Sequence, residues 1–223
     1  MASDAPTQIY LAVEIPPTAA GCAATAAALA RVLDLPRARG LVSAVLLVPA
    51  SGTALDARIT PIVDAAQKRG AAAILTDDAR LARTLRADGV HLGPSADPLA
   101  AYAEAREILG NRFIVGVDAG TSRHDAMSLG EAGADYIGFG LGSPDPAAAD
   151  LRRDLVAWWS EIFEVPCVAF DAASPDDAAD LAAAGAEFVA IRVPAPLSSE
   201  AASHWLDGLL ATLARAAAPS AAQ

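Results

Sequence analysis

The most constraining feature of the sequence is an eightfold alternation of short apolar runs with longer segments of helical periodicity. The apolar runs, each bounded by turn residues, are 8–13, 44–48, 72–75, 89–92, 113–117, 136–139, 167–170 and 188–193. The segments with apolar residues at i, i+3 and i+4 spacing are 19–33, 55–69, 79–86, 99–109, 122–132, 151–163, 175–184 and 199–213. Short apolar strands alternating with helices are typical of parallel βα units.

Eight such units predict an α/β fold, a (β/α)8 TIM barrel in a single domain. A doubly wound open sheet more often uses five or six strands and a Gly-rich first turn, and the first turn here is Glu14-Ile-Pro-Pro-Thr, without GxGxxG. A length of 223 residues suits one barrel. We expect the barrel to span residues 8–215, between a flexible N-terminus, 1–7, and a flexible C-terminal tail, 216–223.

Charge and composition exclude several classes of protein. Sixteen Lys and Arg against 27 Asp and Glu give a net charge of −11, which repels polyphosphate chains and anionic lipid. No apolar stretch reaches the ~20 residues of a membrane helix, and the first residues lack the pattern of a secretory signal. Cys22 and Cys167 lack the spacing of a disulfide scaffold or zinc site. We expect a cytoplasmic protein that binds neither nucleic acid nor membrane.

Several carboxylates follow the predicted strands, and in barrels the chemistry lies at the carboxyl ends of the strands. These residues are Asp77, Asp78, Asp97, Asp118 and Asp171. Oxygen ligands at a barrel mouth suit Mg²⁺, which also retains water and substrate phosphate. The alternative is structural: Asp78 is a candidate helix N-cap, and Asp97 and Asp171 are candidate turn residues.

Four blocks of the sequence occur in an order and spacing that are typical of one enzyme family. They are Ala71-Ala-Ala-Ile-Leu-Thr-Asp-Asp-Ala-Arg-Leu-Ala, Ala87-Asp-Gly-Val-His-Leu-Gly93, Phe113-Ile-Val-Gly-Val117 and Ala132-Gly-Ala-Asp-Tyr-Ile-Gly-Phe-Gly140. Over about residues 70–142 the chain resembles the thiamine phosphate synthase/TenI family. The resemblance implies a (β/α)8 barrel. It also implies a reaction in which a pyrimidine diphosphate joins a thiazole phosphate and releases pyrophosphate with Mg²⁺.

The resemblance also implies roles for individual residues. Asp77 corresponds to the first metal-binding Asp of the family, and Asp97, one place out of register, to the second. His91 and Gly93 fall on the strand-4 motif. His124 lies about four residues after the place of the catalytic His of the TenI branch. The candidate catalytic residues are therefore His91 and His124, although a histidine inside a strand motif is more often a packed, hydrogen-bonded residue.

Positions after the later strands are candidates for binding substrate or phosphate. They are Gly93, Asp118, Gly140, Gly142, Asp171 and Arg192. Arg192 is the one cation at a strand end that is well placed to bind phosphate. Its alternative role is a structural ion pair with Asp171 across neighbouring strands.

The chain departs from the family pattern at the diphosphate site. The family's strand-2 motif Q-x-R-x-K is replaced by Val45-Leu-Leu-Val-Pro-Ala-Ser-Gly52, H-x-G-Q by His91-Leu-Gly-Pro94, and T-x-T-K by Ser143-Pro-Asp-Pro146. The glycines of I-G-G-I are replaced in Ala169-Phe-Asp-Ala-Ala173, and Lys68 is the only lysine. Cations and backbone N–H groups that neutralise a pyrophosphate leaving group are therefore missing.

Three functions stay open from the sequence. The first is a synthase-like transferase with Asp77 and Asp97 on Mg²⁺. The second is a non-catalytic relative that binds a small ligand or a partner. The third is a TenI-like thiazole tautomerase, or another barrel enzyme on a less charged substrate, with His124 or an Asp as proton carrier. The expected partner is a phosphorylated small molecule or related ligand, and a homodimer is one expected assembly.

Overall fold

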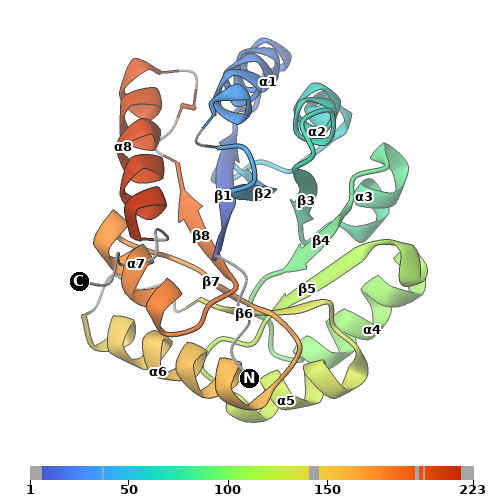
Figure 1. Cartoon of the computed structure of the whole chain (residues 1–223). Coiled ribbons are helices and arrows are strands. Elements are labelled where there is room, and N and C mark those ends of the chain that lie inside the picture. Colours follow the sequence, from blue (N-terminus) through green and yellow to red (C-terminus); the bar gives the residue numbers. More distant parts are fainter. Residues whose placement is uncertain (1–6, 37, 141–145, 194–195, 198, 217–223) are drawn as a thin grey trace, which may run out of the picture.

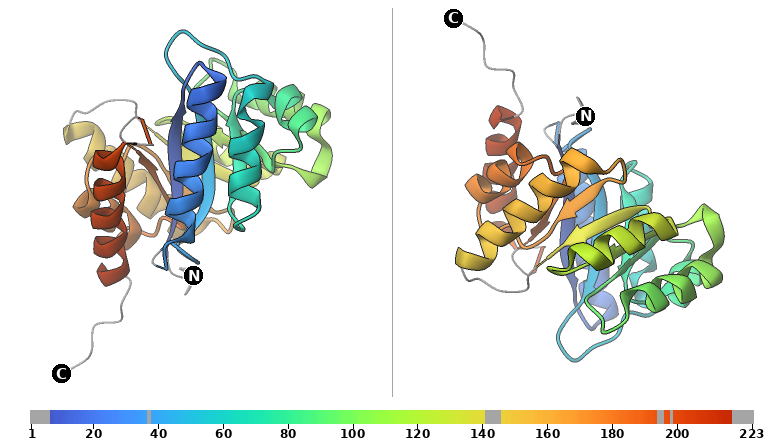
Figure 2. Two further views of the ribbon diagram at one scale, coloured as in Figure 1. Left: turned by 90° about the horizontal axis from the view of Figure 1, so that it is seen from above. Right: turned by 90° about the horizontal axis from the view of Figure 1, so that it is seen from below.

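The computed structural model of the chain describes residues 7–36, 38–140, 146–193, 196–197 and 199–216. Within these residues eight parallel strands pair in sequence order, and β8 pairs with β1, so the sheet closes into a barrel (Figure 1). Helices alternate with the strands and surround them (Figures 1 and 2). The predicted (β/α)8 TIM barrel is therefore confirmed.

The strands agree with the predicted runs to within two residues at either end. They are β1 (Gln8–Ile15), β2 (Val42–Pro49), β3 (Ala72–Thr76), β4 (Gly89–Leu92), β5 (Ile114–Asp118), β6 (Tyr136–Phe139), β7 (Cys167–Ala169) and β8 (Phe188–Arg192).

The helices are also close to prediction, with two differences. They are α1 (Ala19–Asp34), η1 (Ala57–Ile59), α2 (Thr60–Gln67), α3 (Ala79–Leu85), α4 (Pro98–Leu109), η2 (Gly110–Arg112), α5 (Arg123–Ala132), α6 (Pro146–Ile162), α7 (Pro175–Ala183) and α8 (Glu200–Ala216). The predicted helix 55–69 begins as the 3-10 turn η1, because Asp56 caps that turn through Arg58 N. Helix α6 begins five residues before the predicted start, at a proline, which the first turn of a helix tolerates.

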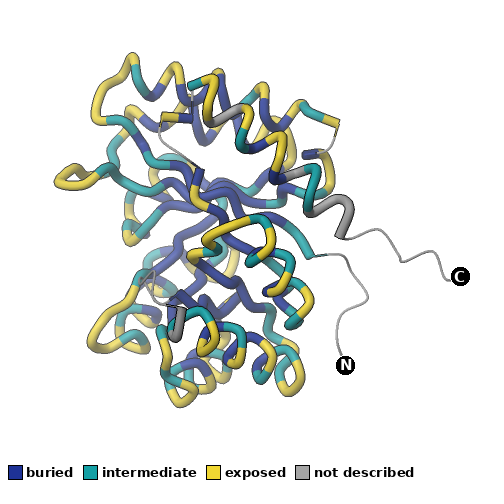
Figure 3. The backbone as a smooth tube through the Cα atoms, turned by 90° about the vertical axis from the view of Figure 1, so that its left-hand side faces the viewer, coloured by how far each residue is buried: buried dark blue, intermediate teal, exposed yellow. Residues whose placement is uncertain are grey.

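The strands separate two layers of apolar side chains. Alternate positions such as Leu11, Val45 and Val90 point outward and pack against the helices. The intervening positions point inward and fill the barrel with Tyr10, Ala12, Ala44, Leu46, Ile74, Tyr136, Val168, Phe170 and Ala190. Figure 3 shows the buried strands enclosed by helices whose outer turns are exposed. This alternation is the period of a β-strand and fixes which residues face the barrel axis.

Three similar turns lead into β4, β6 and β8. Gly133 and Gly185, with φ of 93° and 104°, occupy the left-handed position after α5 and α7, and Arg86, with φ of 56°, occupies it after α3. Each of these turns therefore ends a helix and enters a strand, and one of them uses arginine in place of glycine.

The segments outside the barrel are described only in part. Of 1–7 and 216–223, the structure describes Thr7, whose hydroxyl donates to the Ala186 carbonyl over 3.0 Å, and Ala216, which ends α8. Among the described helices, none has the length and apolar character needed to cross a membrane.

Candidate functional site

Four of the predicted site residues come together where β4 to β7 end. They are His91 on β4, Asp118 at the end of β5, Gly140 after β6 and Asp171 after β7. Gly140 marks their meeting point: a methyl group built on it would lie 2.9 Å from Oδ2 of Asp118 and 3.5 Å from Oδ2 of Asp171. Two carboxylates, from the ends of β5 and β7 on either side of β6, therefore flank Gly140 at the barrel mouth, the end at which barrels carry their chemistry.

The Asp118 carboxyl is nearly enclosed, with 7% of the residue exposed. Its Oδ1 accepts a hydrogen bond from Gly120 N at 2.7 Å. Burial raises the pKa of Asp118 to about 6, against the opposing effect of the backbone N–H groups of Gly120 and Gly140 and with a further rise from the charge of Asp171. This carboxyl therefore exchanges its proton close to neutral pH.

His91 lies inside the barrel, with 4% of the residue exposed. Its Nδ1 lies 3.0 Å from the hydroxyl of Tyr136, and its ring stacks on Phe170 with centroids 4.4 Å apart. Burial lowers the pKa of His91 to about 3. His91 is therefore the packed, hydrogen-bonded and neutral histidine of the alternative interpretation. It lies beside Asp118, since a methyl built on Gly138 would be 3.1 Å from His91 Cε1 and 3.3 Å from Asp118 Cα.

The two predicted metal ligands are engaged elsewhere. Asp77, in a left-handed conformation with φ of 56°, accepts from Gly93 N at 2.7 Å through Oδ1. Asp97 caps α4 by accepting from Ala100 N at 2.9 Å, and Asp78 caps α3 by accepting from Leu81 N at 2.8 Å. The predicted N-cap at Asp78 is thus confirmed, and Asp97 belongs to the start of a helix.

Asp77 and Asp97 also line different depressions of the surface. Asp77 and Gly93 line the one between α3 and α4, while Asp97 lines the one between α4 and α5. Within the described residues, no group of three or more His, Cys, Asp or Glu side chains is arranged to hold a metal ion. The two aspartates, as placed, do not fit a shared Mg²⁺ site.

The structure describes two further predicted residues, His124 and Arg192. His124 is exposed on the first turn of α5 and lines the depression that contains Asp97. Arg192 is exposed at the end of β8, and no ion pair joins it to Asp171, although both residues are described. Gly142 lies outside the described residues.

The sequence reasoning missed a buried cation behind the site. Arg152 on α6 is 3% exposed and donates through Nη1 to the carbonyl oxygens of Phe170 and Asp171, at 2.9 and 2.8 Å. Its Nη2 pairs with Asp177 at 2.8 Å. It thereby fixes the loop that carries Asp171, whose φ is 59°. A signal existed in the sequence: Arg152 precedes the buried residues Leu155, Val156 and Trp159 by three, four and seven positions, so an arginine lies on the apolar face of a helix.

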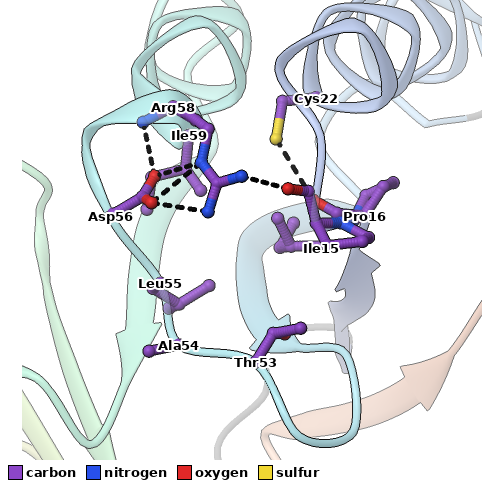
Figure 4. A pocket seen from close by; sticks show the side chains of 10 residues that line it. Ile15, Pro16, Cys22, Thr53, Ala54, Leu55, Asp56, Arg58 and Ile59 are labelled. Atoms are coloured by element: carbon purple, nitrogen blue, oxygen red, sulfur yellow. Dashed lines mark hydrogen bonds and ion pairs between the residues drawn. The ribbon is translucent and has the colours of Figure 1, made fainter.

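A further depression lies near the end of β1, and the polar side chains that line it are bonded to one another or to the backbone. Arg58 pairs with Asp56 and donates to the carbonyl oxygen of Pro17, and the Cys22 thiol donates to the carbonyl of Pro16 at 3.4 Å (Figure 4). Burial raises the pKa of the Cys22 thiol, which keeps it protonated. These contacts hold the loop after β2 against the end of β1 and leave Arg58 already paired.

Comparisons with known proteins agree with this architecture. A family model described as thiamine monophosphate synthase, TMP-TENI, matches residues 26–193. The thiamine-phosphate synthase of Erythrobacter litoralis is 43% identical over 123 residues, which are 53% of this chain and 56% of that protein. The thiamine-phosphate synthase of Rhodospirillum centenum is 42% identical over 129 residues, which are 56% of this chain and 60% of that protein. The matched part thus spans less than two thirds of these relatives.

A solved structure extends the likeness of the fold to almost the whole chain. Thiamine phosphate pyrophosphorylase from Pyrococcus furiosus superposes with a TM-score of 0.68 at 21% identity and covers 94% of this chain and 96% of its own. At that identity the likeness shows the fold alone. The family match covers most of the chain, so the chain belongs to the thiamine monophosphate synthase family, TMP-TENI.

Proposed function

We propose that the barrel mouth binds a small heteroaromatic ring of the kind used in thiamine phosphate synthesis and moves a proton on it, with Asp118 as general acid and base. The observation that carries the proposal is the buried Asp118 carboxyl, whose pKa is about 6. A proton carrier works best when its pKa lies near the operating pH. At pH 7 such a group is mainly carboxylate, with roughly a tenth protonated.

The proposed step is an isomerisation. The Asp118 carboxylate takes a proton from a carbon next to the ring, the electron pair of that C–H bond shifts through the conjugated system, and the carboxylic acid returns a proton to a different atom. Phe170, which stacks on His91, also borders Gly140, since its Cβ lies 3.0 Å from a methyl built there, and an aromatic neighbour suits a ring. Arg192, the exposed cation at the end of β8, is the candidate for holding a phosphate group on the substrate.

Synthase chemistry is the second candidate, and the names of the relatives favour it. In that reaction the pyrimidine diphosphate would lose pyrophosphate while its carbon bonds to the thiazole nitrogen. A pyrophosphate leaving group needs concentrated positive charge. The side-chain atoms nearest to a methyl built on Gly140 belong to Asp118, Phe170 and Asp171, and the two carboxylates among them repel a diphosphate. For this reason we place proton transfer first.

Two parallel assays on the purified chain test the proposal. In one, the phosphorylated thiazole of the TenI reaction is added in D₂O, and isomerisation with deuterium uptake is followed by NMR. In the other, both synthase substrates are added with Mg²⁺, and thiamine phosphate is measured. We expect isomerisation, with kcat/KM rising up to about pH 6 and level above, because the carboxylate is the active form.

The variant Asp118→Asn should lower isomerisation by at least about 100-fold, since it removes the proton carrier. Asp154→Asn, the same change at an exposed position on α6, is the matched control and should leave the rate unchanged. Thiamine phosphate formation that survives Asp118→Asn would establish the second candidate instead. The absence of turnover in both assays would contradict an enzymatic role on these substrates.

A further inference from the structure

Three polar side chains form a hydrogen-bonded chain through the interior of the barrel. The hydroxyl of Tyr10 on β1 lies 2.9 Å from that of Tyr136 on β6, and the Tyr136 hydroxyl lies 3.0 Å from Nδ1 of His91 on β4. The three residues are 3%, 5% and 4% exposed. They come from strands that are distant in the sequence, so only closure of the barrel brings them together.

The three hydrogen-bonded side chains can meet because a glycine, Gly116, lies between His91 and Tyr136. His91, Gly116 and Tyr136 are register partners on the neighbouring strands β4, β5 and β6. A methyl group on Gly116 would overlap the ring of Tyr136. Gly116 therefore allows the tyrosine to cross β5 and reach the histidine.

The number of available protons decides which groups donate in these two hydrogen bonds. Burial raises the pKa of both tyrosines and lowers that of His91, so all three groups are neutral and bring two hydroxyl protons and one ring proton. If Tyr10 donates to Tyr136 and Tyr136 donates to Nδ1, both hydroxyl protons have acceptors. In the reverse direction the Tyr10 proton has no acceptor among the described residues. A buried donor without a partner is unfavourable, so the first direction is preferred.

The preferred direction places the ring proton of His91 on Nε2. This atom has no hydrogen-bond partner in the described part of the chain, and it is not among the fully enclosed polar atoms there. Nδ1 faces Tyr136, the first residue of β6, and Cε1 lies 3.1 Å from a methyl built on Gly138, the next inward position along that strand. The opposite nitrogen, Nε2, therefore faces the strand ends, toward the carboxylates at Gly140.

We propose that Tyr136, supported by Tyr10, is a positioning residue that holds His91 as the Nε2–H tautomer and so presents a neutral N–H donor to an uncharged acceptor atom of a ring bound at the barrel mouth. The catalytic importance of this donor rests on the proposed function, whereas the tautomer does not. A ring nitrogen or a carbonyl oxygen fits the acceptor better than an oxyanion, because Asp118 and Asp171 would repel a negative group there.

The test reads the tautomer directly by NMR. The exposed His124 and His204 are replaced by Gln, so that all ¹⁵N-histidine signals come from His91. Long-range ¹H–¹⁵N spectra then show which ring nitrogen carries the proton. We expect the proton on Nε2, a hydrogen-bonded Nδ1 and no titration between pH 5 and 8.

Two conservative variants complete the test. Tyr136→Phe should remove the hydrogen-bond shift of Nδ1 and let a second tautomer appear. Tyr10→Phe, the matched control, should leave the His91 tautomer unchanged, because Nδ1 is then still the acceptor for the Tyr136 proton within the described residues. A proton on Nδ1 in the parent chain, or a Tyr136→Phe spectrum identical to the parent, overturns the inference.

A ligand measurement then links the tautomer to substrate binding. If the thiazole of the isomerisation assay binds, its addition should shift the Nε2 signal in the parent chain. Tyr136→Phe should then lower kcat more than it raises KM. If the protein turns over no substrate, the proposed function fails while the tautomer assignment is still decided by the spectra, so the two failures are distinguishable.

Discussion

At the scale of single residues, the main feature of the barrel mouth is a buried carboxyl group, that of Asp118. Asp118 keeps a carboxyl group in a nearly closed space, and the neighbouring Asp171 adds to the electrostatic strain. Two backbone N–H groups, of Gly120 and Gly140, offset only part of this cost. A protein tolerates such a group where chemistry requires it, which is why a buried acid in a cleft indicates a functional site.

The raised pKa of Asp118 predicts a specific dependence of stability on pH. The folded pKa, about 6, lies above the unfolded value of about 3.9. Between these values the folded state binds more protons, so the free energy of unfolding falls as the pH rises and the loss is complete above pH 6. Asp118→Asn should therefore gain stability over the parent between pH 4 and pH 7.5, by up to roughly 3 kcal/mol.

Urea denaturation of both proteins at the two pH values measures this difference. Asp154→Asn, at an exposed site, should show no such change between the two pH values. Equal pH slopes for the parent and Asp118→Asn would mean that the carboxyl is solvated in the folded protein.

At this scale the sequence predicts which residues lie near the strand ends, but not how deeply each is buried or which side chains it contacts. Asp118 is a candidate because it follows a predicted strand and His91 because it falls on the strand-4 motif of the family, and both lie beside Gly138 in the structure. The burial that sets their pKa values, and the partners Tyr10 and Tyr136, depend on which strands face each other across the closed barrel. Spacing along a single strand carries no such information. Asp77 and Asp97 line different depressions, because Asp77 binds Gly93 N, 16 residues away after β4, whereas Asp97 binds Ala100 N of its own helix.

At the scale of elements, a repeated carboxylate contact joins three pairs of neighbouring strands, β3 with β4, β5 with β6 and β7 with β8, at the amino end of the barrel. Asp88 accepts from Ala73 N at 2.7 Å, Asp135 from Val115 N at 2.7 Å and Glu187 from Cys167 N at 2.9 Å. In each case the acid that precedes an even-numbered strand binds the start of the strand before it. The three similar turns in the sequence thus share a role in pairing strands as well as in ending helices.

Removal of one such acid should destabilise the barrel measurably. Asp135→Ala leaves Val115 N without its partner and should lower the free energy of unfolding by about 1–3 kcal/mol. Asp135→Asn keeps an acceptor oxygen and should cost less. Arg106 also pairs with Asp135, at 2.6 Å, so Arg106→Ala separates the ion pair from the backbone contact. If Asp135→Ala costs no more than Asp154→Ala at an exposed site, the contact does not stabilise the sheet.

At the scale of the whole molecule, the order of elements was predictable because eight units with covered strands have few ways to pack. A parallel strand needs a helix on its outer face and a filled interior, and eight units satisfy both needs by closing. The small and large inward residues, such as Ala12, Ala44 and Tyr136, then fit one another only in the closed ring. The sequence pattern indicates the apolar runs and the helices, whereas the side chains that fill the interior become visible only with strand pairing.

The excess negative charge acts on the whole molecule and predicts its response to salt. The net charge is −11, and self-repulsion of this kind destabilises a compact chain. Six ion pairs among the described residues oppose this repulsion, and only the Arg152–Asp177 pair is well buried. Exposed pairs contribute about 0–1 kcal/mol each and weaken with salt. Repulsion over longer distances is screened as the Debye length falls from about 30 Å at 0.01 M to 8 Å at 0.15 M.

We therefore expect NaCl to stabilise the protein between about 0.01 and 0.15 M. The expected gain is on the order of 1 kcal/mol, or about 2–4 °C in Tm for a chain of this size. Glu161→Gln removes an exposed charge near the C-terminus of α6, where a negative group is unfavourable, so it should raise Tm at low salt and lose that advantage at 0.15 M. Thermal denaturation of both proteins at the two salt concentrations measures the effect. A Tm that falls with added salt would show that the ion pairs outweigh the repulsion, because screening would then remove more attraction than it relieves.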